Sequence, residues 1–298
     1  MASLKEVVNR INLIAFTQKI TKAMKMISAC KLHKAQQALI PLQEYATQYN
    51  MLLEAVLQGM NSSKLSHPLI TKKIDQPQNL LCIVVTSSRG LCGAFNKNIL
   101  KEVSQHLATI QETQAATIEI LVVGKKAYQF FKKSHLPIID SYVDLLDKSN
   151  LQGSAKLTTY CIEAFEKNYY TEIKLAYTTF TNAFKQEVTI VPFLPFLPKQ
   201  EEPFKQSLLV PLHYIYEPSP QLLLEKLVPH ILQHKIMGML VASSASEHAA
   251  RMATMSQATD NAEELLKMLR ISYNRTRQAI ITNALAEITS GAKALTEM

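Results

Sequence analysis

The residues with the clearest chemical potential are cations close to the N-terminus. Between Glu6 and Glu44 the chain has no aspartate or glutamate, but it has six basic residues: Arg10, Lys19, Lys22, Lys25, Lys31 and Lys34. A solvated helix face usually mixes charges of both signs, because opposite charges one turn apart stabilise a helix. The one-signed stretch therefore favours an acidic protein partner over a plain solvated face. It favours nucleic acid least, since aromatic residues for base stacking do not alternate with the cations.

A second stretch, SSRGLCGAFNKN at residues 87–98, has the pattern of a loop between a strand and a helix. Gly90 and Gly93 permit a tight turn, and the N-terminus of the following helix would attract an anion. The glycine fingerprint of a nucleotide site is incomplete, however, and the chain has no GxxxxGK[ST] motif. We expect a structural turn here, with a nucleotide site as the alternative.

Metal ligands and nucleophiles are not grouped in the sequence. His230 and His234 lie one helical turn apart without a third ligand near them, and no HExxH or GxSxG motif occurs. The four cysteines form no CxxC pair: Cys30, Cys82, Cys92 and Cys161. We expect free thiols, no metal, no cofactor and no catalytic residue. The net charge of +8 agrees with an acidic partner.

Two long segments are predicted to be helices. Residues 4–58 contain no glycine and a single proline, Pro41, where we expect at most a bend; residues 239–290 contain neither glycine nor proline. Before the second segment, residues 221–236 predict a shorter helix broken near Pro229, and Gly291 predicts the end of the long one. No apolar run approaches the ~20 residues of a membrane span, and no signal peptide is apparent.

Between the two segments the pattern changes to short apolar, β-branched runs typical of strands, at residues 80–88, 118–126, 172–180 and 187–195. Helical patterns occur at 96–110, 125–133 and 154–170. Strand–helix alternation predicts an α/β domain with a mainly parallel sheet. Residues 199–212 predict a polar, proline-punctuated link.

The two long helices are expected to pair as an antiparallel coiled coil. Each would reach roughly 80 Å, whereas a domain of about 140 residues is only about 35–40 Å across, so neither can fold back onto it. The predicted domains are an N-terminal helix (1–60), an α/β domain (61–218) and a C-terminal helix (219–298). The predicted seam of the N-terminal helix is Leu13, Phe16, Ile20, Ala23, Ile27 and Cys30.

The predicted seam of the C-terminal helix becomes polar toward its end. Past Ile280 it has almost nothing apolar to bury, so this end is expected to extend past the partner helix or to be enclosed by another protein. The seam is Val241, Ala245, His248, Met252, Met255, Thr259, Ala262, Leu266, Leu269, Tyr273, Thr276, Ile280, Asn283 and Glu287.

Four stretches together form a specific pattern: TQKITKAMKMISACKLHKAQ at residues 17–36, SSRGLCGAFN at 87–96, YEPSP at 216–220 and the run from ASEHAARM to GAKAL at 245–295. They resemble the γ subunits of F-type ATP synthases. The resemblance implies a non-catalytic subunit with a coiled-coil shaft and a Rossmann-like α/β domain. The shaft turns inside a ring of three α and three β subunits, and the α/β domain meets the ε subunit and the c-ring of the membrane sector. Rotation couples proton (or sodium) flow to ATP synthesis, or ATP hydrolysis to the reverse.

The resemblance also implies which side chains touch the ring of α and β subunits. The lysines and Met24 would meet an acidic segment of β, whereas Arg277, Gln278 and Thr282 would meet a loop of β. The implied contact residues are Lys19, Lys22, Met24, Lys25, Lys31, Arg251, Arg277, Gln278, Thr282 and Glu287.

Some positions depart from the family pattern. Ser88 and Ala284 stand where other members carry an acid, which puts one ion pair and one contact near the tip in doubt. The cysteine pair inserted in chloroplast members is absent. The match leaves no room for a transit peptide, so we expect a bacterial protein, peripheral to the cytoplasmic side of the inner membrane, with a mature organellar protein as the less favoured alternative. The alternatives are a basic coiled-coil nucleic-acid binder and a nucleotide-dependent enzyme.

Overall fold

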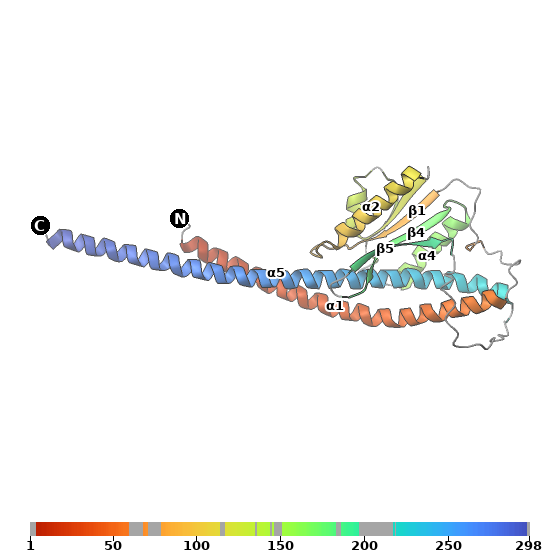
Figure 1. The fold of residues 1–298 in the computed structure, drawn as a ribbon, viewed down its shortest axis with the longest axis horizontal. Coiled ribbons are helices and arrows are strands. Elements are labelled where there is room, and N and C mark those ends of the chain that lie inside the picture. Colours follow the sequence, from red (N-terminus) through yellow and green to blue (C-terminus); the bar gives the residue numbers. More distant parts are fainter. Residues whose placement is uncertain are drawn as a thin grey trace. The chain divides into compact units, whose positions relative to one another are not determined.

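The structure is a computed structural model that describes residues 4–59, 68–70, 79–113, 117–134, 136–143, 145, 151–182, 186–196, 217 and 219–296. Two long helices, α1 (Leu4–Gly59) and α5 (Pro220–Thr296), stand at the two ends of the chain (Figure 1). The chain divides into two compact units. Unit 1 consists of Met1–Ala29 and Arg251–Met298, and unit 2 consists of Cys30–Ala250. The predicted link at 199–212 lies outside the described residues.

In unit 1 the first part of α1 lies antiparallel to the last part of α5. Lys25 Nζ donates to Ser256 Oγ at 2.9 Å, and the Thr21 and Thr259 hydroxyl oxygens are also 2.9 Å apart. Residue numbers rise along one helix as they fall along the other. The predicted pairing of the two terminal helices is therefore confirmed.

The predicted seam of α1 is wrong. Its six residues are all exposed, and Leu13 and Phe16 expose 67% and 64% of their surface. Most of the buried or half-buried positions in residues 4–29 lie on another face of the helix, among them Val7, Ile11, Ile14, Gln18, Thr21, Met24 and Ser28. The prediction selected the most apolar set of positions at heptad spacing, but the face that packs on α5 is partly polar.

The predicted seam of α5 is confirmed from Val241 to Thr276, where every position is buried or half-buried. Ile280, Asn283 and Glu287 are exposed. The predicted break near Pro229 and the predicted end at Gly291 are wrong, because α5 continues through both residues. Proline removes one backbone hydrogen bond, but the residues next to Pro229 are buried, and this packing maintains the helix: Leu224, Val228, Ile231 and Leu232.

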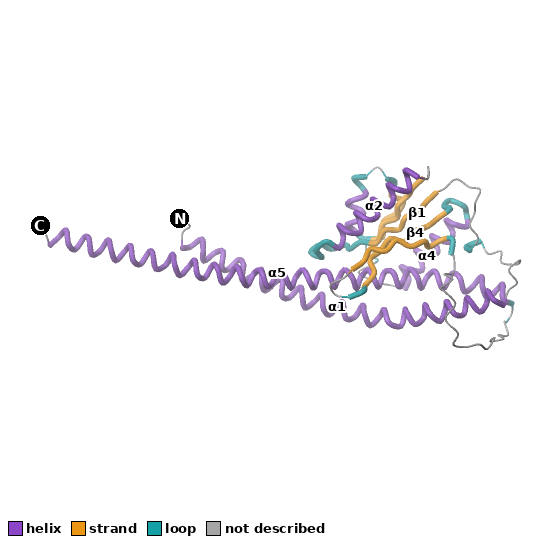
Figure 2. Tube along the Cα trace, viewed as in Figure 1, coloured by secondary structure: helices purple, strands orange, loops and turns teal. Residues whose placement is uncertain are grey.

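Unit 2 contains a five-stranded sheet in the order β3-β2-β1-β4-β5. Figure 2 shows the strands of this sheet in orange. Its strands are β1 (Asn79–Val85), β2 (Thr117–Val123), β3 (Ile138–Tyr142), β4 (Glu172–Phe180) and β5 (Gln186–Leu194). The first four are parallel, and β5 is antiparallel to β4. The mainly parallel sheet is as predicted, but β3 was not expected, because a five-residue strand directly after Pro137 gives little signal.

The helices of unit 2 cover both faces of the sheet. Alternate side chains of β1 point to opposite faces, as a strand requires. Leu80, Cys82 and Val84 pack with α2 (Phe95–Thr113) and α3 (Lys125–Phe131). Leu81, Ile83 and Val85 pack with α4 (Leu151–Glu166) and with the parts of α1 and α5 that belong to this unit. Parts of both long helices, α1 and α5, therefore contribute side chains to the hydrophobic core of the α/β domain.

Candidate functional site

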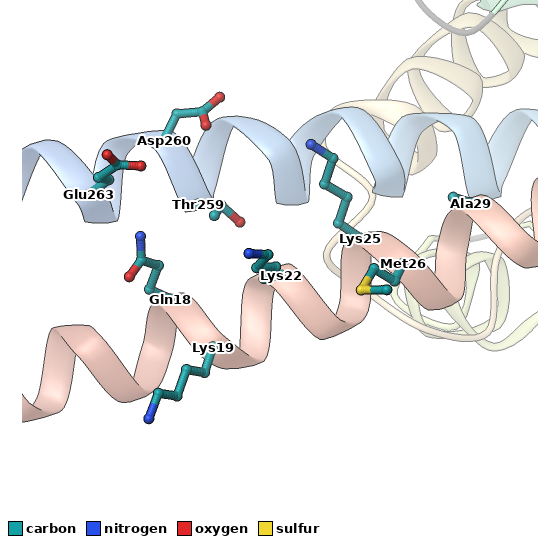
Figure 3. Close-up of a pocket in the computed structure, with 9 residues that line it drawn as sticks. All are labelled: Gln18, Lys19, Lys22, Lys25, Met26, Ala29, Thr259, Asp260 and Glu263. Atoms are coloured by element: carbon teal, nitrogen blue, oxygen red, sulfur yellow. The ribbon is translucent and has the colours of Figure 1, made fainter.

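A polar groove lies between α1 and α5 in unit 1. It encloses about 530 Å³ and is lined by Gln18, Lys19, Lys22, Lys25, Met26, Ala29, Thr259, Asp260 and Glu263. Figure 3 shows Gln18, Lys22 and Lys25 on the side of α1 that faces α5, whereas Lys19 points away from α5. We call this the lysine groove. It brings together three of the residues that the sequence singled out.

The cations of α1 remain largely available to a partner. Lys19, Lys22, Lys25 and Lys31 are all exposed, and Met24 between them is half-buried. Among the described residues, neither Lys19 nor Lys22 forms an ion pair, while Lys25 is held by Ser256. Acids across the groove reduce the local positive charge only in part, because Glu263 pairs with Lys267 of its own helix at 3.4 Å. That pair is exposed and contributes little to stability.

The sequence did not identify the α5 side of this groove. Thr259, Asp260 and Glu263 line it together with Gln18. Which residues face each other across two helices depends on the register of the helices, and the two predicted seams did not specify one. Thr259 was predicted only as a seam position.

The end of α5 has no helix beside it in the described structure. Thr21 lies opposite Thr259, and the two helices are antiparallel. Seventeen residues back along α1 is Leu4, its first residue, and seventeen residues forward along α5 is Thr276, so these two lie at the same level. From Arg277 to Ala292 every residue is exposed. We call residues 277–292 the bare tip. It carries four of the predicted contact residues: Arg277, Gln278, Thr282 and Glu287.

Apolar side chains are also exposed in unit 1. On α1 they form an outer stripe at heptad spacing, which consists of Leu13, Phe16, Ile20 and Ile27. The bare tip exposes Ile280, Ile281, Leu285 and Ile288, which expose 49–67% of their surface. Contiguous exposed apolar surface of this kind marks a site of protein–protein contact.

Arg251 differs from the other predicted contact residues. Only 6% of its surface is exposed. The lysines and the residues of the bare tip are exposed, whereas Arg251 is buried. The ten predicted residues thus fall into three groups: the lysines with Met24, the bare tip, and the buried Arg251.

Side-chain hydrogen bonds hold the turn between β1 and α2 together. The Asn96 side chain accepts a hydrogen bond from the Ser87 backbone N–H at 3.0 Å, and its amide donates to the Ser87 hydroxyl at 2.7 Å. Cys92 and Phe95 pack against Ala250 of α5. Ser88 donates to the carbonyl of Val143 at 2.5 Å.

The part of the sheet where α/β folds usually bind nucleotides is filled by protein. Such ligands bind at the carboxyl ends of strands where the strand order reverses, which here is between β1 and β4. The turn after β1 packs on Ala250, and Ser246 of the same helix donates to the carbonyl of Thr178 in β4 at 3.3 Å. Side chains of α5 therefore occupy this end of the sheet.

Neither a metal centre nor a membrane span is found in the part of the chain that the structure describes. His, Cys, Asp and Glu side chains do not form a group of three or more that could hold an ion. None of the described helices has a segment long and apolar enough to cross a bilayer.

Comparison with known proteins agrees with the resemblance seen in the sequence. The family model described as ATP synthase matches residues 3–295. The chain is 42% identical to the ATP synthase gamma chain of Amoebophilus asiaticus, with 100% of both chains covered, and 37% identical to that of Chlorobium phaeobacteroides, with 99% of both covered.

Two solved structures of Euglena gracilis mitochondrial ATP synthase contain chains of similar fold. A chain of the rotor in rotational state 1 matches with a TM-score of 0.61 and 17% sequence identity, and the match covers 93% of this chain and 98% of the rotor chain. A chain of the OSCP/F1/c-ring structure in rotational state 3 matches with a TM-score of 0.65 and 18% sequence identity. That match covers 98% of this chain and 94% of the other. These likenesses support the fold, and the sequence matches establish the relationship: the chain belongs to the ATP synthase gamma chain family.

Proposed function

We propose that this chain is the rotor shaft of an F-type ATP synthase. It transmits rotation between the membrane sector and the α/β hexamer, and so couples proton (or sodium) translocation to ATP synthesis or hydrolysis. The chain itself holds no catalytic residue and no cofactor. Its partners are three α subunits, three β subunits, the ε subunit and the c-ring. Its place is the cytoplasmic side of a bacterial inner membrane, as a peripheral subunit without a span.

The observation that carries the proposal is the bare tip of α5. An isolated helix gains little stability from propensity alone, yet α5 continues for sixteen exposed residues beyond the last position that α1 covers. Four large apolar side chains are exposed on it. A sleeve of partner subunits would cover this surface. The bacterial gamma chains that match over their whole length support the same assignment.

The lysine groove fits a different part of the same partner. Lys19 and Lys22 have no counter-ion among the described residues, so an acidic segment of β that approaches α1 gains charge attraction without breaking an existing pair. Attraction between exposed charges speeds and orients contact more than it adds affinity. The bare-tip residues Arg277, Gln278, Thr282 and Glu287 would meet a loop of β. Arg251 is nearly buried, so it would contact the α/β hexamer only through the small part of its side chain that is exposed.

The two alternative functions have weaker support. A nucleic-acid binder would use the lysines, but one of them, Lys25, is engaged by Ser256, and no row of aromatic residues accompanies them. A nucleotide-dependent enzyme would need an open crevice at the carboxyl ends of β1 and β4, where α5 packs instead.

The proposal is tested by tagging the chain in its own cells and purifying it from membranes after mild detergent. We expect α and β in equal amounts, this chain in about one-third of that amount from the three-fold ring, and ATPase activity that azide inhibits. Mock-tagged cells give the background. Recovery of the chain alone, or with nucleic acid that salt removes steeply and without ATPase activity, would contradict the proposal.

A further inference from the structure

An aromatic cluster joins α1 and α5 within unit 2. The ring of His234 stacks on that of Tyr45, with centroids 5.8 Å apart and planes 7° apart. Tyr49 lies 5.2 Å from the same imidazole and 6.2 Å from Tyr45. The imidazole is therefore a direct contact between the two long helices.

One nitrogen of this imidazole has no hydrogen-bond partner. His234 Nδ1 is buried and unpaired among the described residues. A neutral imidazole tolerates this, because it can carry its proton on Nε2 and leave Nδ1 as an unused acceptor. A protonated imidazole carries N–H groups on both nitrogens. Protonation would thus place a buried donor at Nδ1 without an acceptor, which is costly.

The groups around the imidazole do not offset this cost. From α1 the groups that face it are the phenols of Tyr45 and Tyr49. From α5 the group that faces the imidazole is His230. No carboxylate pairs with His234 in the described part of the chain. Lys235 is directed toward β5, where it donates to the carbonyl of Pro192 at 3.0 Å. Burial, and secondly the charge of His230, lower the pKa of His234 below its ordinary value.

We propose that His234 makes the packing of α1 on α5 in unit 2 sensitive to pH: the neutral imidazole holds the two helices together, and protonation loosens them. In the unfolded chain the imidazole binds a proton more readily than in the folded chain. The free energy of unfolding therefore falls as pH drops below about 6.5, the ordinary histidine value. A cation over a phenol ring gains some attraction, but this attraction gives the buried Nδ1–H of a protonated His234 no hydrogen-bond acceptor.

The first test compares thermal unfolding of the full chain at pH 7.5 and 5.5. His234→Phe keeps an aromatic ring between the tyrosines but cannot be protonated. We expect the wild-type midpoint to fall by about 2 °C more than that of His234→Phe over this range. His33→Phe, which removes an exposed histidine of α1, is the matched control and should behave as wild type. Equal pH dependence in wild type and His234→Phe would overturn the proposal.

The second test does not depend on a variant of His234 itself. NMR of the chain labelled at its histidine rings follows protonation of His234 directly, with His230→Gln and His33→Phe spectra to assign the signals. We expect a midpoint below 6.5, the Nε2–H tautomer at neutral pH, and lower amide-exchange protection factors, corrected for the intrinsic rate at each pH, at residues 45–49 and 230–234 in acid. A midpoint at or above that of a free histidine, or unchanged protection factors, would overturn the proposal.

Discussion

At the scale of single residues, Arg277 is the side chain whose removal should most clearly affect function. It is exposed at the start of the bare tip, where no part of the described chain covers it. A hydrogen bond to a charged group is worth about 1.5–3 kcal/mol, so Arg277→Ala should lower the ATPase rate of the assembled complex roughly tenfold.

Arg275→Ala is the control for this prediction. Arg275 is also exposed, but residues two positions apart do not face the same side of a helix. It should keep near-normal activity. Equal activity of Arg277→Ala and wild type in the assembled complex would remove Arg277 from the proposed contacts.

The cysteines give a second prediction at this scale. Burial raises the pKa of Cys82 and of Cys161 to about 12, so at pH 8 almost none of either thiol is ionised and reactive. Cys92 is also buried, whereas Cys30 is exposed. An alkylating reagent at pH 8 should therefore modify a single thiol rapidly, at Cys30, and all four only after denaturation. Mass spectrometry of tryptic peptides would identify the sites. Rapid modification of Cys82 would contradict the burial of β1.

At the scale of elements, the pairing of α1 with α5 in unit 1 rests on few apolar contacts. Leu266 is only 7% exposed, while its neighbour Leu265 is 48% exposed. Leu266→Ala should lower the free energy of unfolding by about 2–3 kcal/mol, because it leaves a cavity. Leu265→Ala should change it by no more than about 0.5 kcal/mol. Urea titration followed by circular dichroism measures both. Similar effects of the two substitutions would mean that the register of the helices is wrong.

Several elements could be predicted from the sequence because their signals are local. Strand β1 has seven apolar or amide residues between a polar stretch of sequence and the turn at Ser87, and β4 and β5 have similar β-branched runs. The seam of α5 could be predicted because its small and apolar residues repeat at heptad spacing without a competing set. The mainly parallel sheet followed from the alternation of strands and helices.

Other features could not be predicted because they depend on tertiary packing. On α1 two sets of positions repeat at heptad spacing, and the more apolar set, with Leu13 and Phe16, faces outward. Gln18, Thr21 and Ser28 lie on the inner side, which no rule based on hydrophobicity alone would select. The continuity of α5 through Pro229 depends on buried neighbours. For the candidate site, the lysines could be identified from charge, but the α5 side of the groove required the register.

At the scale of the whole molecule, we expect the bare tip to be dispensable for folding but required for binding to the α/β hexamer. A chain ending at Thr276 loses residues 277–292, all of which are exposed, together with residues 293–298. Its free energy of unfolding should match that of the full chain within about 0.5 kcal/mol. Its affinity for the α/β hexamer, and the ATPase activity of the complex, should be lower.

The comparison needs both measurements on the same preparation. Urea unfolding of the isolated chains reports stability, and titration with purified α/β hexamer reports binding. If truncation destabilised the isolated chain, the tip would have a structural role within the chain. If truncation left binding and activity unchanged, the tip would not be the part that the hexamer covers.

Rotation of this chain inside the hexamer is the central claim, and a single-molecule assay tests it most directly. Cys30→Ser removes the exposed native thiol, and Gln129→Cys supplies an exposed attachment site on α3 in unit 2. The variant is assembled with α and β, the hexamer is fixed to a surface, and a bead is linked to residue 129. On adding ATP, we predict rotation in one direction with three equally spaced pauses per turn, one for each catalytic site. A bead that stays still, or moves without direction, while the same complexes hydrolyse ATP would contradict the claim.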